Sequence, residues 1–241
     1  MSNRARSEEP RAIDEQIPSI FVICGPSGCG KSTLISRLMS DFPGRFGFSV
    51  SHTTRQPRAG EINGVHYNFT TNEKIEAEIN AGLFLEHALV HGNHYGTSFA
   101  AIDSVTNTGK ICILDIDIQG VENVKKSDKV DQSKVVYAML VPPSIEELER
   151  RLRGRQTDSD EVIVRRIARA REEMEYAKKT NEFWDAILVN DNIDNCYDSL
   201  VELVGRKFQL VSPVGSPKGS KLFTLSARKP AAPSNSDLID S

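Results

Sequence analysis

The stretch Gly25-Pro26-Ser27-Gly28-Cys29-Gly30-Lys31-Ser32 decides the fold of this chain. It matches the phosphate-binding loop pattern GxxxxGK[ST] at every fixed position. The apolar run Ile20–Cys24 before it is typical of a parallel strand that is buried on both faces. A helix is predicted to begin at Ser32 after it. A chance glycine-rich turn is the alternative, but the agreement of strand, loop and helix argues against it.

The residue types of this phosphate loop explain what it binds. Glycines let the backbone turn tightly and aim successive N–H groups at an anion, and the N-terminus of the following helix adds partial positive charge. Lys31 would then reach the β- and γ-phosphates of a nucleoside triphosphate, and the Ser32 hydroxyl would bind magnesium. Cys29 stands at a free position, and we interpret it as a small inert filler rather than a redox switch.

Size and composition narrow the class of protein. The 241 residues suit one core with inserted segments. A net charge of −3 gives no overall attraction to nucleic acid, so local arginines must hold any anionic ligand. The cysteines lack C-x-x-C spacing, which favours buried thiols in a reducing cytosol over disulfides or a zinc site. They are Cys24, Cys29, Cys112 and Cys196.

Both ends of the chain differ in composition from the middle. Residues 1–17 are polar and aperiodic and predict a flexible arm, whose acids argue against a transit peptide. Residues 211–241 are rich in Ser, Pro and Lys and predict a disordered tail. No stretch approaches the roughly 18 apolar residues that span a bilayer. We therefore expect one domain at 18–210, in a soluble cytoplasmic protein with no membrane partner.

Four apolar runs predict the strands of a parallel sheet flanked by helices, an α/β fold. They are 20–24, 110–117, 135–141 and 186–191. Ser144 and Glu147 are placed for a capping box at the start of a helix, and an amphipathic helix is predicted at 195–210.

Residues 51–100 predict a small sheet-rich insertion. Strands are expected at 62–69, 83–88 and 94–98, with a helix at 71–81. Arg55 and Arg58 lie in a loop with hydroxyls before them and Pro and Gly around them, which favours a second anion site over a plain loop. Glu86 stands among apolar neighbours, and the pattern leaves open whether it is solvated or binds a ligand.

Two groups of charged residues complete the predicted site. The run 110–117 ends in Asp115 and Asp117, where a carboxylate would lie near magnesium, and strand alternation predicts that both point the same way. Arginines gather on both sides of the turn 154–160. A solvated, ion-paired face is the usual explanation. We interpret Arg155 and Arg166 as a lid over transferring phosphates and most of the others as structural.

Taken together, the sequence resembles the guanylate kinases over about residues 18–210. The segments that carry the resemblance are 25–33, 48–61, 95–97, 112–120 and 151–155. The resemblance implies a phosphate-loop parallel sheet flanked by helices, with a GMP-binding insertion at about 51–100 and a lid at about 144–170. It also implies transfer of the γ-phosphoryl group of ATP to GMP, giving ADP and GDP, with Mg²⁺, in purine nucleotide metabolism. The sequence favours a monomer without fixing the oligomeric state, and it leaves open whether dGMP is accepted beside GMP.

Carried over residue by residue, the resemblance assigns a role to each site position. Positions for the GMP phosphate are Arg55, Arg58, Tyr67 and Tyr95, and those for guanine are Ser51, Glu86, Thr97 and Asp117. Positions for ATP are Gly25, Pro26, Ser27, Gly28, Cys29, Gly30, Lys31, Ser32, Thr33 and Asn190. The catalytic group is Lys31, Arg58, Arg155 and Arg166, and the metal positions are Ser32 and Asp115. Thr97 departs from the serine of many relatives but keeps the hydroxyl.

Two other classes compete with this interpretation. One is the non-catalytic guanylate-kinase-like module of scaffold proteins, which typically loses the phosphate loop, whereas Lys31 and Ser32 are intact here. The other is a different phosphate-loop kinase or NTPase, which a comparison of phosphate acceptors would separate.

Overall fold

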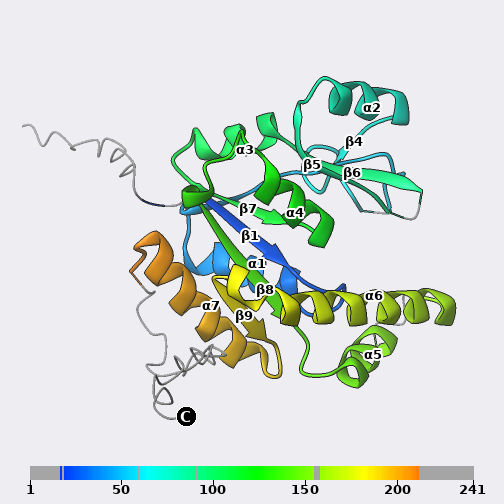
Figure 1. Cartoon of the computed structure of the whole chain (residues 1–241), viewed down its shortest axis with the longest axis vertical. Helices are drawn as coiled ribbons and strands as arrows, with labels where there is room; N and C mark the ends of the chain where they lie inside the picture. The colour runs from blue at the N-terminus through cyan, green and yellow to red at the C-terminus, as the bar shows by residue number, and fades with distance from the viewer. Residues whose placement is uncertain (1–16, 18, 59, 91, 155–157, 212–241) are drawn as a thin grey trace, which may run out of the picture.

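A computed structural model describes residues 17, 19–58, 60–90, 92–154 and 158–211 (Figure 1). The predicted arm apart from Ile17, the predicted tail apart from Val211, and Arg155 lie outside these residues. Within them, no helix is both long and apolar enough to cross a membrane.

The centre of the molecule is a five-stranded sheet with the order β2-β7-β1-β8-β9, in which all pairings are parallel. Its strands are β1 (Ile20–Cys24), β2 (Phe46–Phe48), β7 (Ile111–Asp115), β8 (Val135–Val141) and β9 (Ala186–Val189). The four predicted strands are present, and β2 is an edge strand that the sequence pattern did not predict. The phosphate loop follows β1, so β7 and β8 place their carboxyl ends on either side of it.

Successive residues of β1 pack into two different cores, which explains its continuous apolar run. Phe21 and Ile23 belong to the core under α1 (Lys31–Asp41) and α7 (Ile193–Phe208). Val22 and Cys24 belong to the core on the opposite face, with residues of α3 (Phe99–Thr106) and α4 (Ile118–Lys126). The α/β architecture with helices on both faces is confirmed. Two short 3-10 turns, Gln132–Lys134 and Asn181–Phe183, precede β8 and β9.

A second, four-stranded sheet lies beyond α4 and β7 (Figure 1). Strand β6 is antiparallel to both β3 and β5, and a bulge interrupts the β5–β6 ladder between Phe84 and Glu86. The Thr71 hydroxyl accepts a hydrogen bond from the Lys74 N–H, as expected of a helix cap. The elements are β3 (His52–Thr53), β4 (Asn68–Phe69), α2 (Asn72–Asn80), β5 (Phe84–Val90) and β6 (Asn93–Ser98).

The predicted strand at 62–69 is wrong except for its last two residues. The Ile62 N–H donates to His66 Nδ1 at 3.0 Å and closes a turn. Ile62 and Val65 are each 59% exposed. The alternation that begins at Val65 therefore does not mark a half-buried strand before Asn68.

A pair of helices, α5 (Ile145–Gly154) and α6 (Asp160–Lys179), lies below the second sheet in the view of Figure 1. The two helices share an apolar cluster separate from the two cores of the sheet, made of Leu148, Leu152, Ile163, Ile167 and Ala170. The Ser144 hydroxyl accepts from the Glu147 N–H at 3.2 Å, but the Glu147 carboxylate pairs with Arg150 and Arg151. The structure thus shows the Ser144 half of the predicted capping box.

We predict that Gly25→Ala destabilises the fold by roughly 3 kcal/mol, because a Cβ at φ 144° would lie 2.0 Å from the Leu140 carbonyl oxygen. The control is Gly109→Ala, which also has a positive φ but no heavy atom within 4 Å of its Cβ. The control should cost about 1 kcal/mol. Urea unfolding of both variants measures the difference, and equal losses would show that the close approach to β8 is unimportant.

Candidate active site

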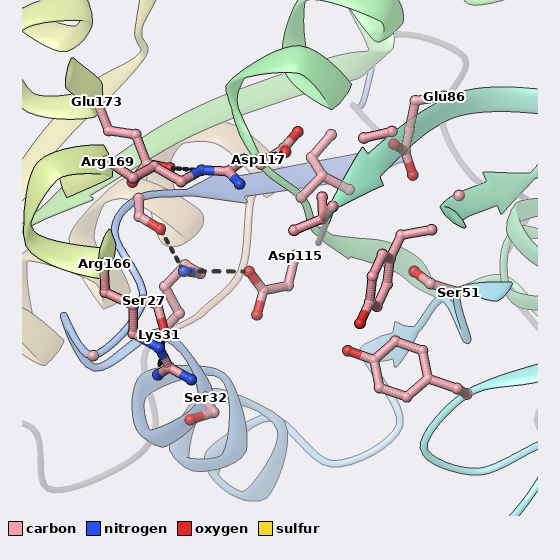
Figure 2. Close-up of a pocket in the computed structure, with 18 of the residues that line it drawn as sticks. Ser27, Lys31, Ser32, Ser51, Glu86, Asp115, Asp117, Arg166, Arg169 and Glu173 are labelled. Atoms are coloured by element: carbon pink, nitrogen blue, oxygen red, sulfur yellow. Dashed lines mark hydrogen bonds and ion pairs between the residues drawn. The ribbon is translucent and has the colours of Figure 1, made fainter. Parts of the chain in front are cut away.

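One cavity of about 540 Å³ extends between the phosphate loop, the second sheet and α6 (Figure 2). It brings together side chains that lie far apart in the sequence. The lining residues that the sequence analysis also selected are Gly25, Ser27, Gly28, Gly30, Lys31, Ser32, Ser51, Arg58, Tyr67, Glu86, Tyr95, Asp115, Asp117 and Arg166.

The phosphate loop has the backbone that an anion site requires. Gly25, Gly28 and Gly30 all have positive φ, and Gly30 is the N-cap residue of α1. Its cap position has no side-chain hydrogen bond, so the first N–H groups of α1 remain available to a phosphate. Asn190 directly follows β9 and is buried. Its Nδ2 donates to the Cys29 carbonyl at 2.7 Å and supports the loop.

Lys31 lies in the cavity between the loop and the end of β7. Its Nζ donates to the Gly25 carbonyl at 2.5 Å and lies 3.7 Å from Asp115 Oδ1 (Figure 2). Burial alone would lower the pKa of Lys31, but the adjacent Asp115 carboxylate raises it above its ordinary value. Lys31 therefore carries a positive charge at neutral pH.

Asp115 and Asp117 point in different directions, so the prediction that they share one direction is wrong. Strand β7 ends at Asp115, which faces Lys31, whereas Asp117 is the N-cap of α4. Asp117 Oδ1 accepts from the Gly120 N–H at 2.9 Å, and Oδ2 lies 2.6 Å from Arg169 Nη2. The strand alternation that supported the prediction does not extend beyond Asp115.

Glu86 is buried at the far end of the cavity, which resolves the ambiguity of its sequence context against a solvated strand position. It is 5% exposed, and a hydrogen bond from Thr97 reaches its carboxylate. Burial raises the pKa of Glu86 to about 7, against the effect of Thr97. Ser51 Oγ lies 3.4 Å from Thr97 Oγ1, and Thr97 is completely buried behind the cavity wall. A buried carboxyl beside two hydroxyls can recognise a polar base edge.

The two arginines of the predicted second anion site have different surroundings. Arg55 forms a bidentate pair with Glu61 at 2.9 and 3.0 Å and lies outside the cavity lining. Arg58 lines the cavity, and its backbone N–H donates to Glu61 at 2.7 Å. Among the described residues, the Arg58 guanidinium has no ion-pair partner. Glu61 was not selected from the sequence, although an acidic residue six positions after Arg55 in the same loop could have indicated an ion pair.

From α6, Arg166 reaches back to the phosphate loop. Its Nη1 donates to Ser27 Oγ at 3.1 Å, and its Nη2 lies 3.1 Å from Asp158. This contact joins the helix pair to the phosphate loop. Other arginines of the helix pair make local ion pairs, as expected for structural residues. These are Arg150 and Arg151 with Glu147, and Arg153 with Glu149 and Asp160.

Sequence reasoning missed two cavity residues on α6, Arg169 and Glu173. They follow Arg166 at intervals of three and four residues, which places all three on one helix face. This spacing is present in the sequence, but it lies within a run of many arginines and glutamates and does not stand out from it. Burial raises the pKa of Glu173, and the positive charge of Lys31 opposes that shift.

The oxygen groups at the phosphate loop fit a magnesium ion. Ser32 and Asp115 both line the cavity, and both supply the hard oxygen atoms that Mg²⁺ prefers. No group of three or more His, Cys, Asp or Glu side chains that could hold a metal occurs within the described part of the chain. Mg²⁺ typically takes only one or two protein ligands beside phosphates and waters.

Four of the positions assigned to ATP lie outside the cavity lining. Pro26, Cys29 and Asn190 are buried, and Thr33 is exposed on α1. Burial raises the pKa of the Cys29 thiol, which fits an inert filler. Nucleotide contacts by these four residues stay predictions.

The fold and the site define a protein of the phosphate-loop nucleotide-binding class, with a cavity that extends from the loop to the second sheet. Comparison with known proteins gives the family, because the guanylate kinase profile matches residues 18–207. The chain belongs to the guanylate kinase family. Members of this family are ATP-dependent nucleoside monophosphate kinases, and their reaction is the ATP-dependent phosphorylation of GMP.

Individual relatives support this membership. The chain is 52% identical to guanylate kinase 1 of Oryza sativa over 76% of its own length, but it spans only 47% of that relative. It is 44% identical to guanylate kinase of Homo sapiens, with 83% of this chain and 98% of the human protein covered. The crystal structure of guanylate kinase from Anaplasma phagocytophilum matches with a TM-score of 0.61 at 27% identity, over 83% of this chain and 92% of that one.

We predict that Glu86→Gln changes the pH dependence of stability. A carboxyl with a pKa of 4.5 when unfolded and about 7 when folded is harder to ionise in the native state. The free energy of unfolding of the wild-type protein should therefore fall relative to that of Glu86→Gln as the pH rises from 4.5 to 7. The loss should level off above pH 7 at roughly 3 kcal/mol.

Urea unfolding between pH 4 and pH 8 measures this change. The control is Glu202→Gln, because Glu202 is exposed on α7. A stability difference between native protein and Glu86→Gln that stays constant with pH would contradict the assigned burial effect.

Proposed function

We propose that this protein is a guanylate kinase, which transfers the γ-phosphoryl group of ATP to GMP to give ADP and GDP. One observation carries the proposal: a single cavity joins the phosphate loop to a pocket with the buried carboxyl of Glu86. Two nucleotides could therefore bind with their phosphates facing each other across the space between Lys31 and Arg58.

The far end of the cavity has the chemistry to read guanine. Guanine presents two donors, N1–H and the 2-amino group, to the carboxylates of Glu86 and Asp117. The Ser51 hydroxyl, which lines the cavity, can donate toward O6, while Thr97 donates to the Glu86 carboxylate from behind the cavity wall. Adenine has an acceptor at N1 and a donor at its 6-amino group, so it would leave buried polar groups unpaired. The predicted preference is GMP over AMP.

The GMP phosphate would lie beside Arg58, Tyr67 and Tyr95, which all line the cavity. The rings of Tyr67 and Tyr95 meet edge to face at 6.0 Å, so their hydroxyls can converge on one anion. Arg55 lies over the Tyr67 ring at 5.4 Å and supports this group from outside the cavity.

Transfer requires that a GMP phosphate oxygen attacks the γ-phosphorus of ATP while the bond to the β–γ bridging oxygen breaks. The phosphates repel one another, and positive groups held in advance reduce that repulsion. Lys31 lies at the donor side, Arg58 at the acceptor side, and Arg166 reaches the phosphate loop from α6. Arg155, outside the described residues, is proposed to join them. Mg²⁺, held by Ser32 with Asp115 nearby, would neutralise charge on the ATP phosphates.

The surroundings of this activity belong to the same proposal. The four cysteines of the chain are buried free thiols, which suits a reducing cytoplasm. A monomer is proposed.

Phosphate transfer from ATP to GMP, AMP, UMP and dTMP, measured side by side, tests the proposed function. We predict rapid transfer to GMP alone, and a smaller preference over AMP in Glu86→Gln, because the variant loses an acceptor for the guanine donors. Equal rates with another acceptor would indicate a different nucleotide kinase. Phosphopeptide binding without transfer would indicate a non-catalytic module.

We predict that Lys31→Ala lowers kcat by roughly 100-fold or more, because it removes the charge closest to the donor phosphates. The change in stability should be much smaller than the change in turnover. Lys178→Ala is the control, since Lys178 is exposed on α6 and pairs locally with Glu175. Near-normal kcat in folded Lys31→Ala would contradict the role of Lys31.

A further inference from the structure

Arg169 connects α6 to the pocket that contains Glu86. Its Nη2 lies 2.6 Å from Asp117 Oδ2, and its Nε donates to Glu173 Oε1 at 3.2 Å (Figure 2). Glu173 is on the same helix and is 8% exposed, whereas Asp117 is 52 residues away in the sequence. The guanidinium thus lies between a carboxylate of its own helix and the carboxylate that caps α4.

We propose that Arg169 is a positioning residue for guanine recognition, acting by holding the Asp117 carboxylate toward the cavity. The inference rests on the proposed function, in which Asp117 and Glu86 accept hydrogen bonds from guanine. It adds to that function a determinant of GMP binding on the lid helix, which the sequence analysis did not select.

The contacts of Asp117 explain how the orientation is set. Oδ1 is held by the Gly120 N–H and Oδ2 by Arg169, so rotation of the carboxylate would break a contact at one end or the other. Charge-assisted hydrogen bonds of this length are strong and directional. Each oxygen retains a lone pair for a further donor. The remaining lone pairs are therefore presented in one fixed arrangement.

A second contribution is electrostatic. Gly120 is close to Glu86 as well, because a Cβ at that position would lie 2.9 Å from Glu86 Oε2. The two carboxylates of the pocket therefore meet at the same N-terminus of α4, where they repel each other. The Arg169 guanidinium is the cation that contacts Asp117 directly, and it offsets that repulsion. Guanine then binds to carboxylates that are already arranged to accept its donors.

The same contacts argue against a direct role for Arg169 in phosphate transfer. Its guanidinium is bonded to two carboxylates, whereas the Arg58 guanidinium has no ion-pair partner among the described residues and can receive a phosphate. Arg166 bonds a hydroxyl of the phosphate loop itself. Arg169 should consequently affect the binding of GMP rather than the rate of transfer or the binding of ATP.

A double-mutant cycle on the full chain tests the inference, with Arg169→Ala, Asp117→Asn and the double variant. Asparagine remains a good helix cap, so α4 should keep its N-terminus. We expect Arg169→Ala to raise KM for GMP about tenfold, with kcat and KM for ATP changed less than threefold. In the Asp117→Asn background the same change should raise KM for GMP less than threefold, because Asp117 mediates the effect.

Two further variants separate positioning from a structural effect. Arg171→Ala removes an exposed arginine of the same helix outside the cavity and should leave all three constants unchanged. Arg169→Lys keeps the charge and should restore part of the lost GMP affinity. Circular dichroism of each variant checks that α6 is folded.

Several outcomes would overturn the inference. Independent effects of Arg169→Ala and Asp117→Asn on KM for GMP would show that Arg169 does not act through Asp117. A fall in kcat or a rise in KM for ATP, with KM for GMP unchanged, would make Arg169 a phosphate-binding residue instead. If the native protein transfers phosphate to GMP and Arg169→Ala behaves identically, the inference fails while the proposed function stands. If the native protein does not transfer phosphate to GMP, both fail.

Discussion

Pairing of charges inside a partly buried cleft is the constraint on which this site depends. A charge removed from water is costly unless an opposite charge and hydrogen bonds compensate for it. Lys31 has Asp115, Arg166 has Asp158, and Arg169 has Asp117. The Lys31 and Arg169 pairs each join two different elements of the fold, whereas Asp158 lies in the turn directly before α6. The pairs that stabilise the buried charges therefore also help to fix the geometry of the cleft.

The parts around the cleft are held together by different forces. The phosphate loop is set by backbone packing, since the Gly25 Cα approaches the β8 backbone too closely for any side chain, and by the Asn190 hydrogen bond to Cys29. The pair α5–α6 has an apolar cluster of its own and contacts the loop through Arg166. A helix pair with its own apolar cluster can bring positive groups to phosphates that the loop holds.

Much of the fold could be predicted because its signals are local. Apolar runs without alternation identified four of the five strands of the central sheet, and glycines with the following lysine identified the phosphate loop. Each element that the sequence pattern did not predict was missed for a physical reason. Strand β2 is three residues long and contains Gly47, and α3 is a short helix, so neither extends far enough to show a period. Helix α4 was missed because Asp117 was assigned to the strand before it, whereas it caps the helix.

The candidate site also has a part that local sequence patterns predicted and a part that they could not predict. The sequence by itself determined the family, four strands of the central sheet and most cavity residues, since these follow from motifs within a few neighbouring positions. Only the tertiary structure decided which charged groups meet. The contacts Arg169–Asp117, Arg166–Ser27 and Asn190–Cys29 span 52, 139 and 161 residues. Local periodicity shows which face a side chain occupies within its own element, and the packing of distant elements decides what it finds there.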